Sequence, residues 1–377
     1  MADNKDKKVL NVPALRFPEF TGEWKSVHLE DVAEFQKKRI SSDLLNNNNY
    51  ISTENILQNF EGIQYSSSIP TNTNVIEYQK GDILLSNIRP YLKKVWFSDR
   101  KGGCSADVFV LRGDKCDQHF LYYVIASDRF INYVMSGVKG VKMPRGDKNQ
   151  MKKYAFSIPT NTEQRKIAKF LSMLDERIKL QNKIIEKLET LIKGIRDYVL
   201  NNKLQNTTKK KLGELCTITT GKLDANAMKS EGLYPFFTCA EDVYRIDSFA
   251  FDTEALLVSG NGANLGYIHY YKGKFNAYQR TYVLSNFIED IHYIQIYLEA
   301  YLHKRIALEK STSNTPYIVL ATLAEMPIII PSIKIQKDIS NKILILKSKL
   351  ITEIYIHNCY KDCLLYTSDA ADDLTRV

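Results

Sequence analysis

The sequence predicts an α/β (α+β) chain in which two similar domains are separated by two long antiparallel coiled-coil helices, as a tandem repeat with pseudo-two-fold symmetry. Three observations predict this fold: an internal similarity at a fixed offset, a long heptad pattern after the first copy, and a weaker one after the second. A chain of 377 residues fits two or three domains. With 44% hydrophobic and 25% charged residues, it is not a disordered, fibrous or small disulfide-stabilised protein.

The internal similarity is strongest around Pro144 and Pro316, which lie 172 residues apart. The same offset aligns two Ile-Pro pairs, at 158–159 and 330–331, and the helices that begin after them. Upstream, the offset is expected to drift by about one residue, because loops accept insertions. The expected upstream matches are Val110-Leu111 with Val283-Leu284, Leu84-Leu85 with Leu256-Leu257, and two amphipathic helices at 118–136 and 290–308.

Apolar residues after Pro159 recur at alternating steps of four and three, which is typical of a coiled coil. Gln181 is the one polar residue within the first seam, and the second seam weakens at Glu353 and His357. The second helix has the first as its natural antiparallel partner, and an intermolecular coiled coil is the alternative. The seam residues are Ile167, Leu171, Leu174, Ile178, Ile185, Leu188 and Ile192 in the first helix, and Ile339, Ile343, Leu346 and Leu350 in the second.

These patterns divide the chain into five segments. We expect a first domain over 1–158, a helical spacer over 159–206, a second domain over 207–330, a second helical spacer over 331–364 and a tail over 365–377. The tail has no heptad pattern and carries three aspartates and one arginine, so we expect it to be disordered or non-native to the fold.

Sequence motifs for catalysis and metal binding are weak. The glycine-rich stretch 260–266 precedes an expected strand, whereas a dinucleotide site needs a helix there. Asn-Thr-Pro-Tyr at 314–317 departs at Thr315 from the Asn-Pro-Pro-Tyr motif of adenine methyltransferases, and Glu23-x-Lys25 is too short for a nuclease metal site. The group His357-x-Cys359-x₃-Cys363 lacks a fourth ligand and is interpreted as ordinary helix residues. We therefore expect no catalytic residue, no metal site and no bound cofactor.

The net charge of +9 and the duplicated basic loops favour double-stranded DNA as a partner. Arginine can donate two hydrogen bonds to guanine, asparagine or glutamine can pair with adenine, and lysine neutralises phosphate. The candidate DNA-binding residues are Lys38, Arg39, Ser86, Asn87, Arg89, Lys93, Lys94, Lys142 and Arg145 in the first domain, and Lys222, Ser259, Asn261, Asn264, Lys272, Lys274, Gln279, Arg280 and Tyr317 in the second.

Several segments in order resemble the specificity (S) subunits of bacterial type I restriction-modification enzymes over residues 9–364. They are Val-Pro-Ala-Leu-Arg-Phe-Pro-Glu-Phe at 12–20, Gly-Glu-Trp at 22–24, Gly-Asp-Ile-Leu-Leu-Ser-Asn-Ile-Arg-Pro-Tyr at 81–91, Gly-Cys-Ser-Ala-Asp-Val-Phe-Val-Leu-Arg at 103–112, Leu-Val-Ser-Gly-Asn-Gly-Ala-Asn-Leu-Gly-Tyr at 257–267, Phe-Asn-Ala-Tyr-Gln-Arg-Thr-Tyr-Val-Leu at 275–284, and the helix openings at 158–164 and 330–336.

The resemblance implies two target recognition domains, each reading one half of a split DNA site. It also implies that the helices set the spacing and bind two modification (methyltransferase) subunits, which carry the restriction subunits. The chemistry of S-adenosylmethionine, ATP and Mg²⁺ would then belong to those partners, and this chain would be non-catalytic. A coiled-coil scaffold without DNA specificity and a free-standing methyltransferase or nuclease are the alternatives. The N-terminus has no secretory signal and no run is long enough to span a membrane, so we expect a cytoplasmic protein without membrane contacts.

Overall fold

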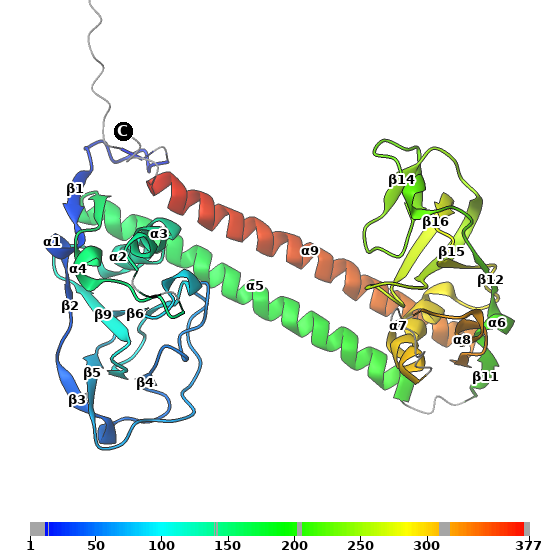
Figure 1. The fold of residues 1–377 in the computed structure, drawn as a ribbon, viewed down its shortest axis with the longest axis horizontal. Helices are drawn as coiled ribbons and strands as arrows, with labels where there is room; N and C mark the ends of the chain where they lie inside the picture. Colours follow the sequence, from blue (N-terminus) through cyan, green and yellow to red (C-terminus); the bar gives the residue numbers. More distant parts are fainter. Residues whose placement is uncertain are drawn as a thin grey trace, which may run out of the picture. The chain divides into compact units, whose positions relative to one another are not determined.

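The computed structural model describes residues 12–13, 15–138, 140, 142–201, 206–308 and 317–372 (Figure 1). The chain forms two compact units, Met1–Asn182 with Ile356–Val377, and Lys183–Tyr355. We call them the N-terminal unit and the C-terminal unit. Two long helices, α5 (Asn161–Asn201) and α9 (Ile333–Asp372), each contribute residues to both units.

Three sheets and several short helices make up the N-terminal unit. The strand orders are β2-β9-β6-β7, β3-β5-β8-β4 and β1-β10. The elements are β1 (Lys25–His28), α1 (Leu29–Val32), β2 (Ala33–Phe35), β3 (Arg39–Ser41), η1 (Ser42–Leu44), β4 (Tyr50–Ile51), β5 (Asn74–Tyr78), β6 (Ile83–Ser86), η2 (Pro90–Leu92), β7 (Val95–Phe97), β8 (Gly102–Cys104), β9 (Val108–Gly113), α2 (Gln118–Ile125), α3 (Asp128–Ser136), α4 (Lys148–Lys152) and β10 (Ala155–Ile158).

The C-terminal unit has a six-stranded sheet, in the order β12-β17-β15-β16-β13-β14, and a β11-β18 pair. Its elements are β11 (Thr208–Lys211), α6 (Leu212–Leu215), β12 (Thr217–Thr220), η3 (Ala225–Ala227), β13 (Tyr234–Phe237), β14 (Tyr244–Ile246), β15 (Phe251–Ser259), β16 (Ile268–Ala277), β17 (Thr281–Ser285), α7 (Ile291–Leu308), α8 (Leu320–Ala324) and β18 (Pro327–Ile330). The order β12-β17-β15-β16 matches β2-β9-β6-β7, so the predicted repeat is confirmed as a repeated fold.

Strand pairing gives the register of the repeat and corrects one expected match. Ile83 pairs with Leu111, and Leu256 pairs with Leu284, so the two strands correspond at an offset of 173 residues (83 to 256, 111 to 284). The match of Val110-Leu111 with Val283-Leu284 is confirmed. The match of Leu84-Leu85 with Leu256-Leu257 is wrong by one residue, because Leu84 and Leu85 correspond to Leu257 and Val258.

The offset of 173 residues extends across two more strand pairs, so β15 corresponds to β5 and β6 together, and β16 to β7 and β8. Tyr78 pairs with Gly102 as Phe251 pairs with Phe275. Before this region the offset is larger, since Phe35 and Ile218 both face the aligned leucines, Leu111 and Leu284. The first copy is therefore ten residues longer between these points (35 to 78 against 218 to 251).

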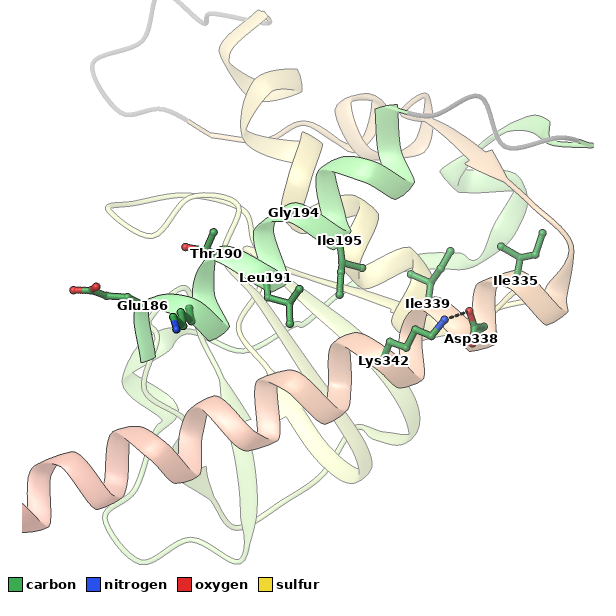
Figure 2. A pocket seen from close by; sticks show the side chains of 10 residues that line it. Glu186, Thr190, Leu191, Gly194, Ile195, Ile335, Asp338, Ile339 and Lys342 are labelled. Atoms are coloured by element: carbon green, nitrogen blue, oxygen red, sulfur yellow. Dashed lines mark hydrogen bonds and ion pairs between the residues drawn. The ribbon is translucent and has the colours of Figure 1, made fainter. Parts of the chain in front are cut away.

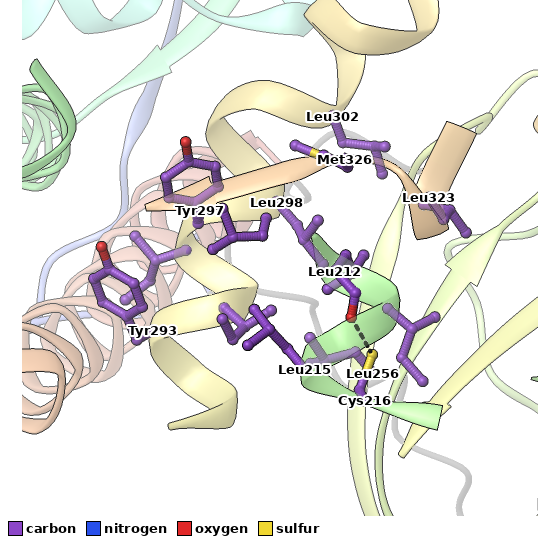
Figure 3. Packing of buried hydrophobic residues seen from close by; sticks show 14 of the residues in the cluster. Leu212, Leu215, Cys216, Leu256, Tyr293, Tyr297, Leu298, Leu302, Leu323 and Met326 are labelled. Carbon is purple, nitrogen blue, oxygen red and sulfur yellow. Dashed lines mark hydrogen bonds between the residues drawn. The ribbon is translucent and has the colours of Figure 1, made fainter. Parts of the chain in front are cut away.

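Helices cover one face of each central sheet. In the C-terminal unit, Leu256 and Val258 face a cluster with α6 and α7, while Leu257 belongs to a separate cluster on the opposite face (Figure 3). Apolar residues of α7, among them Tyr293, Leu298 and Leu302, fill the first cluster. The single helix expected at 118–136 is instead two, α2 and α3, because the Ser127 side chain caps a new helix by accepting from the Phe130 N–H.

The two seams are confirmed by the burial of the long helices. All the predicted seam residues are buried or half-buried, and Gln181 is 7% exposed. His357 is 8% exposed and its Nδ1 has no hydrogen-bond partner, so burial lowers the pKa of its imidazole. The backbone of α9 continues to Asp372, past the expected end at Leu364, and so the expectation of a disordered tail is wrong over 365–372. The alanines at 370–371 favour a helix without any heptad pattern.

Candidate nucleic-acid interface

A buried glutamine in each copy attaches the start of the long helix to its domain. Gln164 accepts a hydrogen bond from the Asp117 N–H (2.8 Å) and donates one to the Pro159 carbonyl (2.8 Å). Gln336 does the same with the Asp290 N–H (3.0 Å) and the Pro331 carbonyl (2.9 Å). Because Asp117 and Asp290 also cap the first turns of α2 and α7, each glutamine fixes the long helix to the helix covering the sheet.

In the N-terminal unit, backbone contacts bring together the loop after β6 and the segment before α4. The Arg89 N–H donates to the Pro144 carbonyl (2.8 Å), and Ile88 forms a bridge with Arg145. Both arginines are exposed, and Arg89 has a left-handed backbone (φ 50°) just before Pro90. Arg145 lies 3.2 Å from an Asp107 carboxylate oxygen. These two guanidinium groups therefore share one surface.

Several first-domain candidates have local roles instead. Ser86 is 1% exposed and its hydroxyl donates to the Ile88 carbonyl, so its proposed contact with DNA is ruled out by burial. Lys94 donates to the Thr53 carbonyl (2.7 Å), and burial lowers the pKa of its ammonium. Lys93 is paired with Asp128 at 2.7 Å. These contacts hold the loop in place.

The remaining first-domain candidates differ in their surroundings. Lys38 lies 2.7 Å from a Glu77 carboxylate oxygen, and Arg39 donates to the Asn74 carbonyl (3.1 Å), although both side chains are exposed. Lys142 is exposed. The Oδ1 of Asn87 is buried without a hydrogen-bond partner, so this amide oxygen is not presented to a ligand.

Five second-domain candidates share one surface. Asn261, in the loop after β15, bridges with Tyr317, and the neighbouring Gly260 N–H donates to the Arg280 carbonyl (2.9 Å). The Gln279 N–H donates to the Leu223 carbonyl (2.9 Å), which places Lys222 next to the same turn. Lys222, Gln279, Arg280 and Tyr317 are exposed and Asn261 is half-buried.

The other second-domain candidates lie elsewhere or are inaccessible. Ser259 is 1% exposed, so the proposed contact of its hydroxyl with DNA is wrong. Lys272 and Lys274 project from β16, where Lys272 lies 3.6 Å from a Glu254 oxygen and Lys274 lies 4.7 Å above the Phe249 ring. Asn264 is half-buried within the 260–266 loop.

Sequence reasoning missed a group of three lysines in the N-terminal unit, Lys37, Lys148 and Lys152, whose charges act on one another. The available signal was the i,i+4 spacing of the last two, followed through to the turn after β2. Within the part of the chain that the structure describes, no three His, Cys, Asp or Glu side chains gather as metal ligands, and no helix is long and apolar enough to cross a membrane.

A groove of about 930 Å³ lies between antiparallel stretches of α5 and α9 in the C-terminal unit (Figure 2). Leu191, Ile195 and Ile339 line its apolar floor. A Cβ added to Gly194, in the same wall, would meet nothing within 4 Å. The charged side chains at its margins are Glu186, Lys187, Asp338 and Lys342.

Comparisons with known proteins agree with this architecture. A 132-residue stretch is 44% identical to the type I restriction enzyme EcoDI specificity subunit of Escherichia coli, a match that covers 35% of this chain and only 29% of that relative. The chain is similar in fold to the crystal structure of a type-I restriction-modification system S subunit from M. genitalium, with 17% identity, a TM-score of 0.72, and coverage of 95% of this chain and 98% of that one.

A second solved chain, from a study of complex assembly and conformational transition of the type I R-M system, has 19% identity and a TM-score of 0.51, and the match covers 92% of this chain and 97% of that one. The family model for the type I restriction modification DNA specificity domain matches twice, over residues 21–190 and 205–356. The two matches contain the two repeated sheets and their glutamine-anchored helices. The chain therefore belongs to the type I restriction modification DNA specificity domain family.

Proposed function

We propose that this chain is the DNA sequence-recognition subunit of a type I restriction-modification complex, with each unit reading one half of a bipartite site. The observation that carries this proposal is a duplicated surface. In both units the loop after the central strand is held by backbone contacts beside the segment that follows the repeated proline, Pro144 or Pro316. Exposed side chains able to read bases lie on this surface in each copy: Arg89 and Arg145, or Gln279 and Arg280.

The chemistry of these side chains fits recognition without catalysis. A guanidinium group can donate two hydrogen bonds to guanine O6 and N7, and an amide can pair with adenine N6 and N7. Exposed lysines such as Lys142 and Lys222 suit phosphate oxygens, which position a protein on DNA without reading its sequence. Methylation and cleavage would be carried out by partner subunits that use S-adenosylmethionine, ATP and Mg²⁺.

We expect Arg280→Ala to weaken binding to the specific site by about 1–3 kcal/mol, if the side chain forms a bidentate contact with guanine. Arg89→Ala should have the same effect on the other half-site. The measurement selects bound duplexes from random DNA with the chain and its modification partner, and then determines affinity for the selected site. Arg165→Ala, an exposed arginine on α5, is the control. Selection that yields no split motif would contradict the proposed function.

We also propose that the groove between α5 and α9 binds a modification (methyltransferase) subunit, which in turn carries a restriction subunit. An apolar floor with charged margins suits an amphipathic helix. The solved relative from a study of complex assembly in a type I R-M system supports a partner of this kind. Two such subunits are expected in the complex, and the groove is a candidate site for one of them.

Filling the groove is expected to block this partner. Gly194→Trp places a large side chain in open space on the wall of the groove, and removing a glycine from a helix interior does not harm the helix. We expect the affinity for the modification subunit, measured by titration calorimetry, to fall by about tenfold or more, roughly 1.4 kcal/mol. Gly194→Ala is the matched control and should bind normally. Equal binding by both variants would exclude the groove as the docking site.

A further inference from the structure

The three lysines missed by sequence reasoning form a compact group around two phenylalanine rings in the N-terminal unit. The Lys148 ammonium lies 4.7 Å from the centre of the Phe35 ring and 5.7 Å from that of Phe109. The two rings meet edge to face at 5.5 Å, so they form a fixed support beneath this side chain. Lys37 follows Phe35 after one residue, and Lys152 lies one turn further along α4 than Lys148.

The charges in this group are alike and are not balanced by a neighbouring acid. Burial lowers the pKa of Lys148 most, and the positive charges of Lys37 and Lys152 lower it further. In contrast, Lys38 is paired with Glu77 and Lys93 with Asp128. Three ammonium groups held together in this way repel one another, and an anion bound among them would remove that repulsion.

The second copy provides an internal comparison, because the lysines have no basic equivalents there. At the repeat offsets, Lys148 and Lys152 correspond to Leu320 and Ala324, and Lys37 corresponds to Thr220. Leu320 is 52% exposed. The fold therefore does not require lysine at these positions, and the basic group is a property of the N-terminal unit.

We propose that Lys37, Lys148 and Lys152 bind phosphate groups of the DNA backbone, giving the N-terminal unit a sequence-independent anchor that the C-terminal unit lacks at the equivalent place. This inference rests on the proposed DNA-recognition function. Arg145 and the start of α4 are only three residues apart, so the anchor adjoins the surface proposed to read bases. Phosphate contacts there would set the register in which Arg89 and Arg145 meet the base edges.

The test is the salt dependence of DNA binding by the full chain with its modification partner. Each lost phosphate contact lowers the slope of log affinity against log salt by about 0.9. We expect Lys148→Met to lower the slope by about one contact, and the triple variant K37M/K148M/K152M by two to three contacts. Methionine keeps an unbranched chain over the two rings, and thermal unfolding checks that the variants fold.

Two controls separate phosphate binding from other effects. Lys115→Met removes the same charge beyond the opposite end of the β2–β9 pairing and should leave the slope unchanged. A scrambled duplex should lose as much affinity as the selected site in the lysine variants, whereas Arg280→Ala should affect only the selected site. Wild-type slopes in folded triple variants would overturn the phosphate anchor and leave DNA recognition intact. Failure of the wild-type complex to prefer any sequence would instead overturn the proposed function, and with it this inference.

Discussion

Replacing Ile343 by aspartate is expected to unfold the C-terminal unit, whereas the same substitution at Ile345 leaves it folded. Ile343 is 1% exposed and belongs to the cluster that joins α9 to α6, α7 and β15. A carboxylate there would have no partner, and the lost packing and the buried charge together should cost more than about 4 kcal/mol. Ile345, two residues further along the helix, is 68% exposed.

Urea unfolding of both variants, followed by circular dichroism, measures the difference in the free energy of unfolding. Hydrogen exchange of β11 and β18 then reports whether the loss lies in the C-terminal unit. If Ile343→Asp were no less stable than Ile345→Asp, the seam would not contribute to this core.

Gln336→Ala should destabilise the chain by about 3 kcal/mol, more than Gln164→Ala, for which we expect about 2 kcal/mol. Gln336 is 0% exposed, and besides the two hydrogen bonds shared with Gln164 it donates to a Glu289 carboxylate oxygen (2.8 Å). Alanine would leave the Asp290 N–H, the Pro331 carbonyl and the Glu289 carboxylate without this partner. Each uncompensated buried group costs about 1–3 kcal/mol.

Thermal and urea unfolding of the two variants check this order. Gln295→Ala, on α7, is the matched control, because its side chain is only half-buried and hydrogen-bonds within its own helix to Glu299. Equal losses for Gln336→Ala and Gln164→Ala would show that the additional bond to Glu289 contributes nothing.

The helical part of the fold was predictable because burial on one face of a helix leaves a periodic pattern. Ile167 to Ile192 shows that pattern without interruption, and each seam position is buried or half-buried. The one-residue error at Leu84-Leu85 has a physical reason. Strand β6 is buried on both faces, so its residues, Ile83–Ser86, do not alternate between apolar and polar, and sequence alone cannot assign them to a face.

The candidate site was predictable where accessibility follows from a turn, and unpredictable where it depends on distant residues. Arg89 and Arg280 lie in turns at the ends of strands and are exposed as expected. Lys94 looks similar in sequence, but the Thr53 carbonyl takes up its ammonium. Ser86 and Ser259 end buried strands, and only the sheet pairing shows that their side chains are enclosed.

The ten-residue difference between the copies falls entirely between β2 and Tyr78 in the first and between β12 and Phe251 in the second. From these points to the aligned leucines, Leu111 and Leu284, neither copy has gained or lost a residue relative to the other. Length variation since the duplication has thus been accepted at the start of each domain, where it leaves the central strands and the helix anchors in register. Hybrid chains that exchange these opening segments should therefore be viable starting points for altering one half-site at a time.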